Sequence, residues 1–193
     1  MQLYEYEGKR LFEKYGIRVP RGVTVRSGDD IGAAYETLKS EKVFLKAQVL
    51  AGKRGKEGGV ILCEGAANTI KTAAYLLNRD VGGLRPIALR MEEAVTVVGE
   101  YYLAILYDTA KQMPTLLYSS YGGVDIEEVP TQVIERYALD VRQDSVHFPI
   151  PYSGDLWQCF LREDARLVEI NPLIKTSDWQ WIAVDAKVAL DDD

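Results

Sequence analysis

LKAQVLAGKRGKEGGV, residues Leu45 to Val60, joins the end of an apolar run to a basic loop rich in glycine. The loop interleaves cations with glycines: Lys53, Arg54 and Lys56 stand among Gly52, Gly55, Gly58 and Gly59. Glycine can take positive φ and approach a ligand closely, so successive N–H groups can converge on an anion while the cations supply charge for a polyphosphate. The pattern is neither a Walker loop nor the dinucleotide-binding fingerprint. A solvent-exposed basic turn has the same composition, so the loop alone leaves both interpretations open.

The composition is ordinary for a globular protein of one domain or two small lobes: 193 residues, 47% of them hydrophobic and 27% charged. The net charge of −6 disfavours nucleic acid as a partner, because binding a phosphate backbone requires a broad basic surface. No apolar run reaches the roughly 20 residues needed to span a bilayer, and no signal peptide opens the chain. Two widely separated cysteines, Cys63 and Cys159, are typical of reduced thiols. These features predict a cytoplasmic protein that binds neither nucleic acid nor a membrane.

Hydrophobic periodicity and turn residues predict a mixed order of helices and strands. Helices are expected over residues 4–15, 31–38 and 67–78, and Ser27 with Asp30 resembles a capping box before the second of them. Strands are expected over residues 43–49, 60–63, 87–94, 101–107 and 115–120. Because the order does not alternate strictly, we expect an α+β protein with antiparallel sheets.

The segments 166–173 and 181–188 read as two paired strands around a short turn. Side chains alternate along a strand, so Glu169 and Asn171 share one face, and Asp185 is expected opposite Asn171 on the second strand. Carboxylate and amide oxygens are the ligands that Mg²⁺ prefers. An amphipathic hairpin with a polar solvent face would show the same pattern. Asn171 followed by Pro172 favours the metal site, because both residue types fit poorly in a central strand.

Four segments in this order resemble signatures of the succinyl-CoA synthetase β subunits, an ATP-grasp family. They are Leu3–Lys9 (LYEYEGK), Lys46–Gly59 (KAQVLAGKRGKEGG), Gly122–Glu127 (GGVDIE) and Val168–Leu173 (VEINPL). The resemblance covers nearly the whole chain, and citryl-CoA synthetase and ATP-citrate lyase chains share the same motifs. Four ordered motifs are specific where a single glycine loop would be weak.

The resemblance implies an ATP-grasp fold, with two α+β lobes and a nucleotide cleft between them. One lobe is expected at about residues 20–92, and the other at about 1–19 plus 93–193. The second, CoA-ligase-type domain of the family is not present in this sequence. The chain departs from the family at Leu50 and Lys53, where histidine and glycine are usual, and at Tyr121, where glutamate is usual. Compared with the usual length of the family, the chain is about 20 residues shorter before Leu156, which is the length of a helix with its connections.

The resemblance also assigns roles to single residues. The expected nucleotide contacts are Lys46, Gly52, Lys53, Arg54, Gly55, Glu92, Val95 and Glu100. Asn171 and Asp185 match the magnesium ligands, and Glu169 and Arg54 are the expected catalytic residues. By pattern alone Glu92 and Glu100 could be solvated acids at strand ends, and Gly122-Gly123 could be only a tight turn.

The function implied is that of the nucleotide-binding, β-type part of an acid–CoA ligase similar to succinyl-CoA synthetase, with ATP (or GTP) and Mg²⁺ as cofactors. In that family ATP phosphorylates a histidine of an α-type, CoA-binding subunit, and an acyl phosphate of a small carboxylic acid then reacts with CoA. The single histidine of this chain, His147, lies in a polar loop outside every motif, so we expect activity only with a partner subunit. The alternatives are a truncated, non-catalytic nucleotide-binding or assembly module and an ATP-grasp ligase that joins a carboxylate to an amine.

Overall fold

The computed structural model describes residues 1–52 and 54–192, which form two compact units. The smaller unit comprises Pro20–Val95, and the larger unit comprises Met1–Val19 together with Thr96–Asp193. Each unit has its own antiparallel sheet and its own hydrophobic core.

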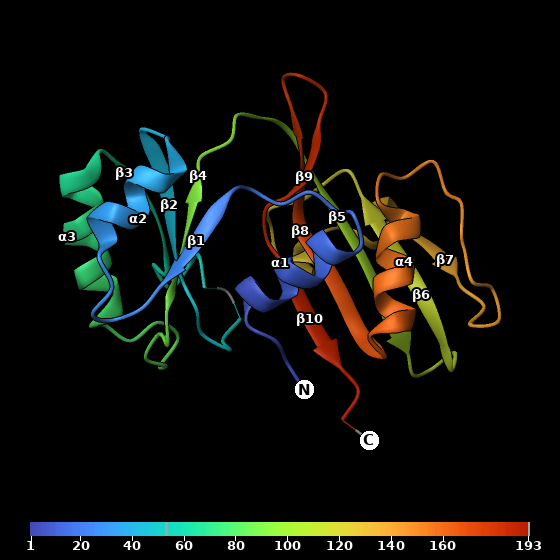
Figure 1. Ribbon diagram of the computed structural model, residues 1–193. Coiled ribbons are helices and arrows are strands. Elements are labelled where there is room, and N and C mark those ends of the chain that lie inside the picture. Colours follow the sequence, from blue (N-terminus) through green and yellow to red (C-terminus); the bar gives the residue numbers. More distant parts are fainter. Residues whose placement is uncertain (53, 193) are drawn as a thin grey trace. The chain divides into compact units, whose positions relative to one another are not determined.

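The smaller unit is a four-stranded sheet with two helices on one face (Figure 1). Its elements are β1 (Gly22–Val25), α2 (Ile31–Leu38), β2 (Lys42–Ala47), β3 (Val60–Glu64), α3 (Ala66–Leu77) and β4 (Leu89–Glu93), with the strands in the order β1-β4-β2-β3. Val43 and Leu45 of β2 are fully buried in the core, as are Leu89 and Met91 of β4. Because side chains alternate, Lys46 and Glu92 point to the other face of this sheet.

The capping box expected before α2 is wrong. Asp30 is the N-cap, and its carboxylate accepts a hydrogen bond from the N–H of Ala33 at 2.9 Å. The carboxylate of Asp29 accepts from the N–H of Arg26 instead, which closes a tight turn over the Ser27 position. Since the turn ends one residue before the helix, the capping acid is the residue that directly precedes Ile31.

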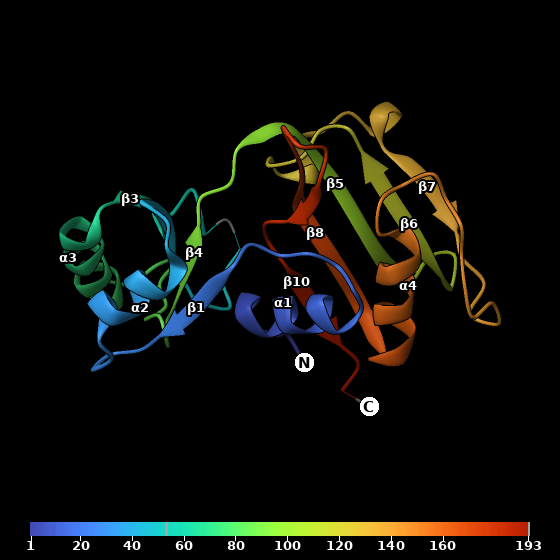
Figure 2. The same cartoon turned by 45° about the horizontal axis from the view of Figure 1, so that its top comes forward.

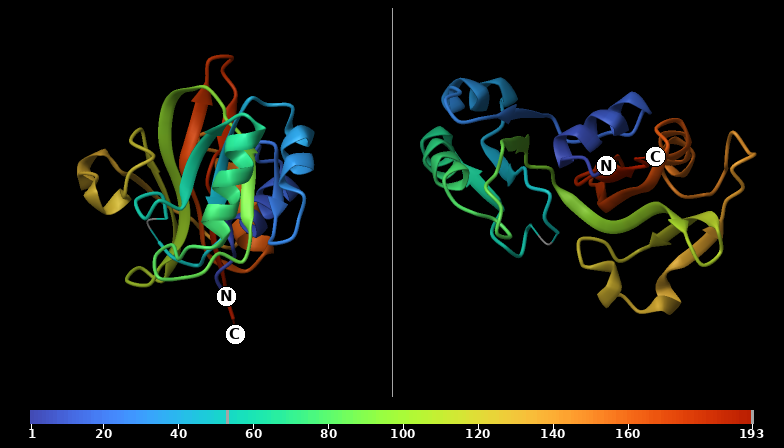
Figure 3. Two further views of the ribbon diagram at one scale, coloured as in Figure 1. Left: turned by 90° about the vertical axis from the view of Figure 1, so that its left-hand side faces the viewer. Right: turned by 90° about the horizontal axis from the view of Figure 1, so that it is seen from below.

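The larger unit is a six-stranded sheet with α1 and α4 on one face and the segment that carries two short 3₁₀ helices on the other (Figures 2 and 3). Its elements are α1 (Glu5–Lys14), β5 (Val97–Asp108), β6 (Met113–Ser119), the 3₁₀ helices Ile126–Glu128 and Thr131–Val133, β7 (Glu135–Ala138), α4 (Ser153–Arg162), β8 (Ala165–Thr176), β9 (Trp181–Ala183) and β10 (Lys187–Leu190). The strand order is β10-β8-β5-β6-β7, and β9 pairs with β8.

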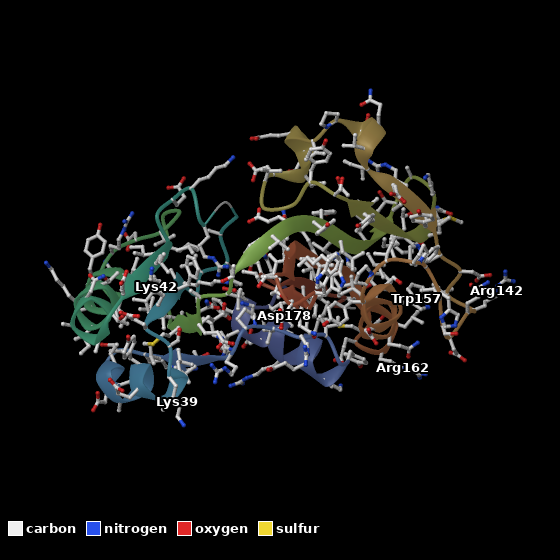
Figure 4. All side chains as sticks on the ribbon, turned by 90° about the horizontal axis from the view of Figure 1, so that it is seen from above. Lys39, Lys42, Arg142, Trp157, Arg162 and Asp178 are labelled. Atoms are coloured by element: carbon white, nitrogen blue, oxygen red, sulfur yellow. The ribbon has the colours of Figure 1, made fainter. Side chains whose placement is uncertain are left out.

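Helix α4 anchors the core of the larger unit through Trp157, which is fully buried against the sheet (Figure 4). The indole N–H donates to the carbonyl of Gln143 at 2.9 Å, so the polar edge of the ring is satisfied. Cys159, on the same helix, is also fully buried, and burial raises the pKa of its thiol to about 12. A thiol with that pKa stays protonated and serves packing rather than reactivity.

The strand expected over 181–188 is interrupted in the structure. β9 pairs with β8 from Leu173 to Lys175, β10 pairs with β8 from Glu169 downward, and residues 184–186 lie between the two ladders. Pro172 has no N–H to donate, so the ladder cannot continue regularly at this point. Its carbonyl accepts from the N–H of Val184 at 3.1 Å, which keeps the two segments adjacent.

Candidate functional site

In the smaller unit, two of the predicted nucleotide-site residues form a buried ion pair. Lys46 Nζ lies 2.9 Å from Glu92 Oε2, and the side chains are 5% and 1% exposed. The pair results from the register of β2 against β4, in which Lys46 is opposite Arg90 and Phe44 is opposite Glu92. Arg90 Nε lies 3.1 Å from the other carboxylate oxygen, so Glu92 lies between two cations. A lysine and an arginine held at one carboxylate form a fixed positive group at the start of the basic loop.

The basic loop itself folds back on its own backbone. The N–H of Gly59 donates to the carbonyl of Arg54 at 2.9 Å, and the guanidinium of Arg54 donates to the carbonyl of Ala47 at 3.1 Å. A Cβ on Gly59 would lie 2.6 Å from Val81 and 2.8 Å from the Arg54 side chain, so only glycine fits there. The guanidinium of Arg79 also contacts the loop, because it donates to the carbonyl of Glu57 at 3.1 Å. Arg54 therefore shapes the loop in addition to any contact with a ligand.

Gly52 and Gly55 differ from Gly59, because the packing of the chain does not require them to be glycine. A Cβ on either would meet no atom within 4 Å. Neither appears among the glycines with positive φ. An approaching ligand would be a reason to keep these positions small. Lys53, the remaining residue predicted in this loop, lies outside the described residues.

In the larger unit, Glu100 and Asn171 meet at the Gly122-Gly123 turn. Glu100 lies within β5, which begins at Val97, rather than at the start of a strand as expected. A Cβ on Gly123 would lie only 2.1 Å from the carboxylate of Glu100. Asn171 Oδ1 accepts from the N–H of Gly123 at 2.8 Å, and Asn171 Nδ2 donates to the carbonyl of Val124 at 2.9 Å. Val95, another predicted nucleotide contact, is half-buried and ends the smaller unit.

Asp185 lies across from Asn171, as the hairpin register requires. The two ladders that flank the interruption pair Leu173 with Ala183 and Glu169 with Lys187, so both keep the same register. Asp185 Oδ1 accepts from the N–H of Ala186 at 2.8 Å. This register places the Asn171 position in β8 opposite the Asp185 position between β9 and β10.

Glu169 is the acidic residue next to this pair. Burial is the main cause that raises the pKa of its carboxyl group, and the charges of Asp185 and Glu127 raise it further. Lys187 opposes the shift, with its Nζ 4.0 Å from Glu169 Oε2. The same burial raises the pKa of the Tyr102 phenol, which also feels the charge of Glu169. This face of the sheet therefore gathers negative charge that a cation would stabilise.

The donor set fits Mg²⁺ in its chemistry. Asn171 and Asp185 offer hard oxygens, and one accepted N–H leaves each group with further lone pairs. Within residues 1–52 and 54–192, no group of three or more Asp, Glu, His and Cys side chains is arranged to hold a metal ion. An ion at Asn171 and Asp185 would therefore complete its shell with water and phosphate oxygens, as Mg²⁺ commonly does.

The structure brings the predicted residues together in two groups, one in each unit. Lys46 and Glu92 form the first, and Asn171, Asp185 and Glu169 form the second, with Glu100 joined to Asn171 through Gly123. Arg90 is not among the residues predicted from the sequence, although its position two residues before Glu92 on a strand places both side chains on one face. The bonds from Asn171 to residues 123 and 124 were not predicted either, because these residues are 48 and 47 positions away along the chain and the bonds have no local sequence signal.

Comparison with known proteins identifies the family. The family model for the ATP-grasp domain matches residues 2–150, and the chain belongs to this family. The β subunit of succinate–CoA ligase [ADP-forming] from Methanocaldococcus jannaschii is 37% identical over 215 residues, which is all of this chain and 58% of that protein. The corresponding subunit from Bacteroides thetaiotaomicron is 37% identical over 213 residues, with 57% of its length covered. The chain thus spans little more than half the length of these relatives.

Solved structures with the same fold include two acyl-CoA enzymes. ATP citrate lyase from Methanothrix soehngenii, in complex with citrate and coenzyme A, superposes with a TM-score of 0.73 at 21% identity, over 99% of this chain and 51% of that one. A dinucleotide-forming acetyl-coenzyme A synthetase from Ca. Korarchaeum cryptofilum superposes with a TM-score of 0.68 at 18% identity, over 98% of this chain and 93% of that one. These likenesses establish the ATP-grasp fold. No helix within the described parts of the chain has the length and apolar character needed to cross a bilayer.

Proposed function

We propose that this chain is the nucleotide-binding part of an acid–CoA ligase of the succinate–CoA ligase type. It binds ATP with Mg²⁺ and passes the γ-phosphoryl group to a histidine of an α-type partner, which carries the CoA site. Support comes from 37% identity to a succinate–CoA ligase β subunit over the full length of the chain. The ATP citrate lyase and acetyl-coenzyme A synthetase that share the fold were solved with coenzyme A bound, the latter with a phosphorylated phosphohistidine segment.

The observation that carries the proposal is the buried Lys46–Glu92 pair at the start of the basic loop. A buried cation needs a compensating charge, and Glu92 supplies it. When a triphosphate is bound, Lys46 and Arg54 contact its oxygens, and the backbone of Gly52 and Gly55 approaches them closely. Fixed cations of this kind stabilise the charge that spreads over the oxygens of a transferring phosphoryl group.

The remaining residues have complementary roles. The nucleoside of ATP is contacted by Glu92, Val95 and Glu100. The metal is held by Asn171 and Asp185. A bound Mg²⁺ supplies charge neutralisation to the phosphate oxygens. Glu169 accepts or returns a proton near the reacting group, because burial keeps the pKa of its carboxyl above the ordinary value of 4.5. The free, buried thiols of Cys63 and Cys159 agree with a reducing cytoplasmic location.

Calorimetric titration with ATP and with GTP, each with Mg²⁺ or with a chelator, tests the nucleotide site. We expect binding that depends on Mg²⁺ and that favours one of the two nucleotides. A chain that binds neither nucleotide contradicts the proposal.

Incubation with ATP, Mg²⁺, CoA and succinate or citrate tests the partner requirement. We expect acyl-CoA and ADP only after an α-type subunit is added. Acyl-CoA formed by the lone chain would show that no partner histidine is needed, and nucleotide binding without turnover in either case would favour a non-catalytic binding module.

A further inference from the structure

The segment Gly122–Val124 is held from two sides within the larger unit. On one side, the N–H of Gly122 donates to the carbonyl of Glu100 at 3.1 Å. On the other side, the Asn171 side chain accepts from the N–H of Gly123 at 2.8 Å and donates to the carbonyl of Val124 at 2.9 Å. The segment therefore depends on one side chain for two of its hydrogen bonds.

The two glycines allow this close attachment. A Cβ on Gly122 would lie 2.3 to 2.5 Å from backbone atoms of Tyr101, which cannot move without disturbing β5. Gly123 has a φ of +73° and lies against the Glu100 carboxylate. The backbone path is thus specific to this position, and a ligand is not required to explain the glycine pair.

The orientation of the Asn171 amide is fixed by its two partners. A backbone N–H needs an acceptor and a carbonyl needs a donor, so the oxygen must face Gly123 and the nitrogen must face Val124. The amide oxygen that accepts from Gly123 is also the atom proposed to bind the metal. An amide oxygen has two lone pairs, so it can accept one N–H and bind one cation at the same time.

We infer that Asn171 is a positioning residue for the segment Gly122–Val124, and that a cation bound at Asn171 and Asp185 holds the segment in its attached form. The second part rests on the metal site of the proposed function. If the Asn171 side chain rotates away, both hydrogen bonds and the metal ligand are lost together. A cation that binds only the attached form therefore lowers the opening of the segment by a factor of one plus the ratio of ligand concentration to Kd.

Amide hydrogen exchange of Gly123, followed by NMR in a chelator without nucleotide, tests the attachment. Asn171→Asp keeps an oxygen for Gly123 and for a metal but places a second oxygen against the Val124 carbonyl. We expect Gly123 to exchange about tenfold faster in this variant, whereas Asp185→Asn leaves the rate at the wild-type value. Exchange of the Ile105 amide in β5 serves as the internal reference for global stability, and Asn171→Ala serves as a second variant.

If the Gly123 exchange rate relative to Ile105 is unchanged in both Asn171 variants, the attachment is wrong.

The role of the metal is tested by comparing Gly123 exchange in ATP with Mg²⁺ and in ATP with a chelator. At ten times the measured Kd, we expect Mg²⁺ to slow Gly123 exchange about tenfold in the wild-type chain and to have no such effect in Asp185→Asn.

The outcomes separate the inference from the proposed function. Two results would contradict the coupling between cation binding and the attached segment but leave the nucleotide site in place. In the first, ATP with Mg²⁺ binds and Gly123 exchange does not slow. In the second, exchange slows equally with ATP alone. If titration shows no Mg²⁺-dependent binding, the metal site and the coupling are both wrong, and the attachment is still decided by exchange without metal.

Discussion

Replacing Lys46 by methionine separates the structural role of the buried ion pair from its role in binding. Methionine keeps most of the side-chain volume but removes the charge 2.9 Å from Glu92, whose side chain is 1% exposed. Breaking a buried pair usually costs about 3–5 kcal/mol in the free energy of unfolding. Arg90, 3.1 Å from the same carboxylate, compensates part of the stranded charge, so we expect a loss of about 2–4 kcal/mol.

The double variant Lys46→Met with Glu92→Gln completes the test. Removing both charges of a buried pair is often nearly neutral, but Glu92→Gln also removes the carboxylate beside Arg90, so the double variant should recover part of the lost stability, as measured by urea unfolding. It should not recover ATP binding, which we expect to be weaker by about 1.5–3 kcal/mol in both variants, the scale of a hydrogen bond to a charged group. Isothermal titration with ATP and Mg²⁺ measures that affinity.

The chain offers a matched control in the larger unit. Lys9 and Glu5 form another buried pair, with 2.8 Å between Nζ and Oε1 and side chains 1% and 2% exposed. Lys9→Met should destabilise the chain to a similar extent and leave the ATP affinity unchanged. Wild-type ATP affinity in the Lys46→Met, Glu92→Gln double variant would refute a phosphate-binding role for Lys46.

Three further predictions concern other residues. Asp185→Asn should leave the free energy of unfolding within about 1 kcal/mol of wild type and remove the Mg²⁺ dependence of ATP binding, and a retained dependence in titrations would contradict the metal assignment. Gly55→Ala should leave stability unchanged or raise it by up to about 1 kcal/mol, because the added Cβ has open space, yet weaken ATP binding by about 1.5 kcal/mol; equal affinity would show that no ligand approaches this position. Hydrogen bonds from Lys14 and then Tyr15 lower the pKa of Glu163 from 4.5, so its stabilising effect is present above pH 4.5 and is lost as the pH falls through the lowered pKa. The gap in unfolding free energy between the wild type and Glu163→Gln should therefore shrink below pH 4.5, and a gap that stays constant with pH would argue against the pair.

The local patterns in the sequence predicted most helices and strands, because hydrophobic periodicity is carried by residues that are close together along the chain. Val43, Phe44 and Leu45 form an apolar run, and the strand that this run predicts is β2, in which Val43 and Leu45 are fully buried. The ATP-grasp fold followed from the resemblance of four ordered motifs and is confirmed by the family match. The capping box at Ser27 failed because two adjacent acids take different roles: Asp29 closes the turn with the N–H of Arg26, and Asp30 caps the helix through the N–H of Ala33.

The contacts within the candidate site were harder to predict, because they depend on strand register between distant segments. Lys46 meets Glu92 only because β4 inserts beside β2 in one particular register. Asn171 reaches Gly123 across 48 positions of sequence, and no periodicity encodes that distance. The interruption after Ala183 could have been predicted from Pro172, which has no N–H to donate. The return of β10 to the same register on β8 could not, because it depends on the rest of the sheet.

Residues 184–186, which lie between β9 and β10, act as a spacer whose length is fixed by the strand pairing on both sides. Because β9 and β10 keep one register, Lys187 faces Glu169 while Val188 is fully buried among the core residues of the larger unit. Deleting one spacer residue would exchange these two faces, moving the ammonium group of Lys187 into the core and Val188 out of it. The length of the spacer therefore decides which faces Lys187 and Val188 occupy, independently of the role proposed for the Asp185 side chain within it.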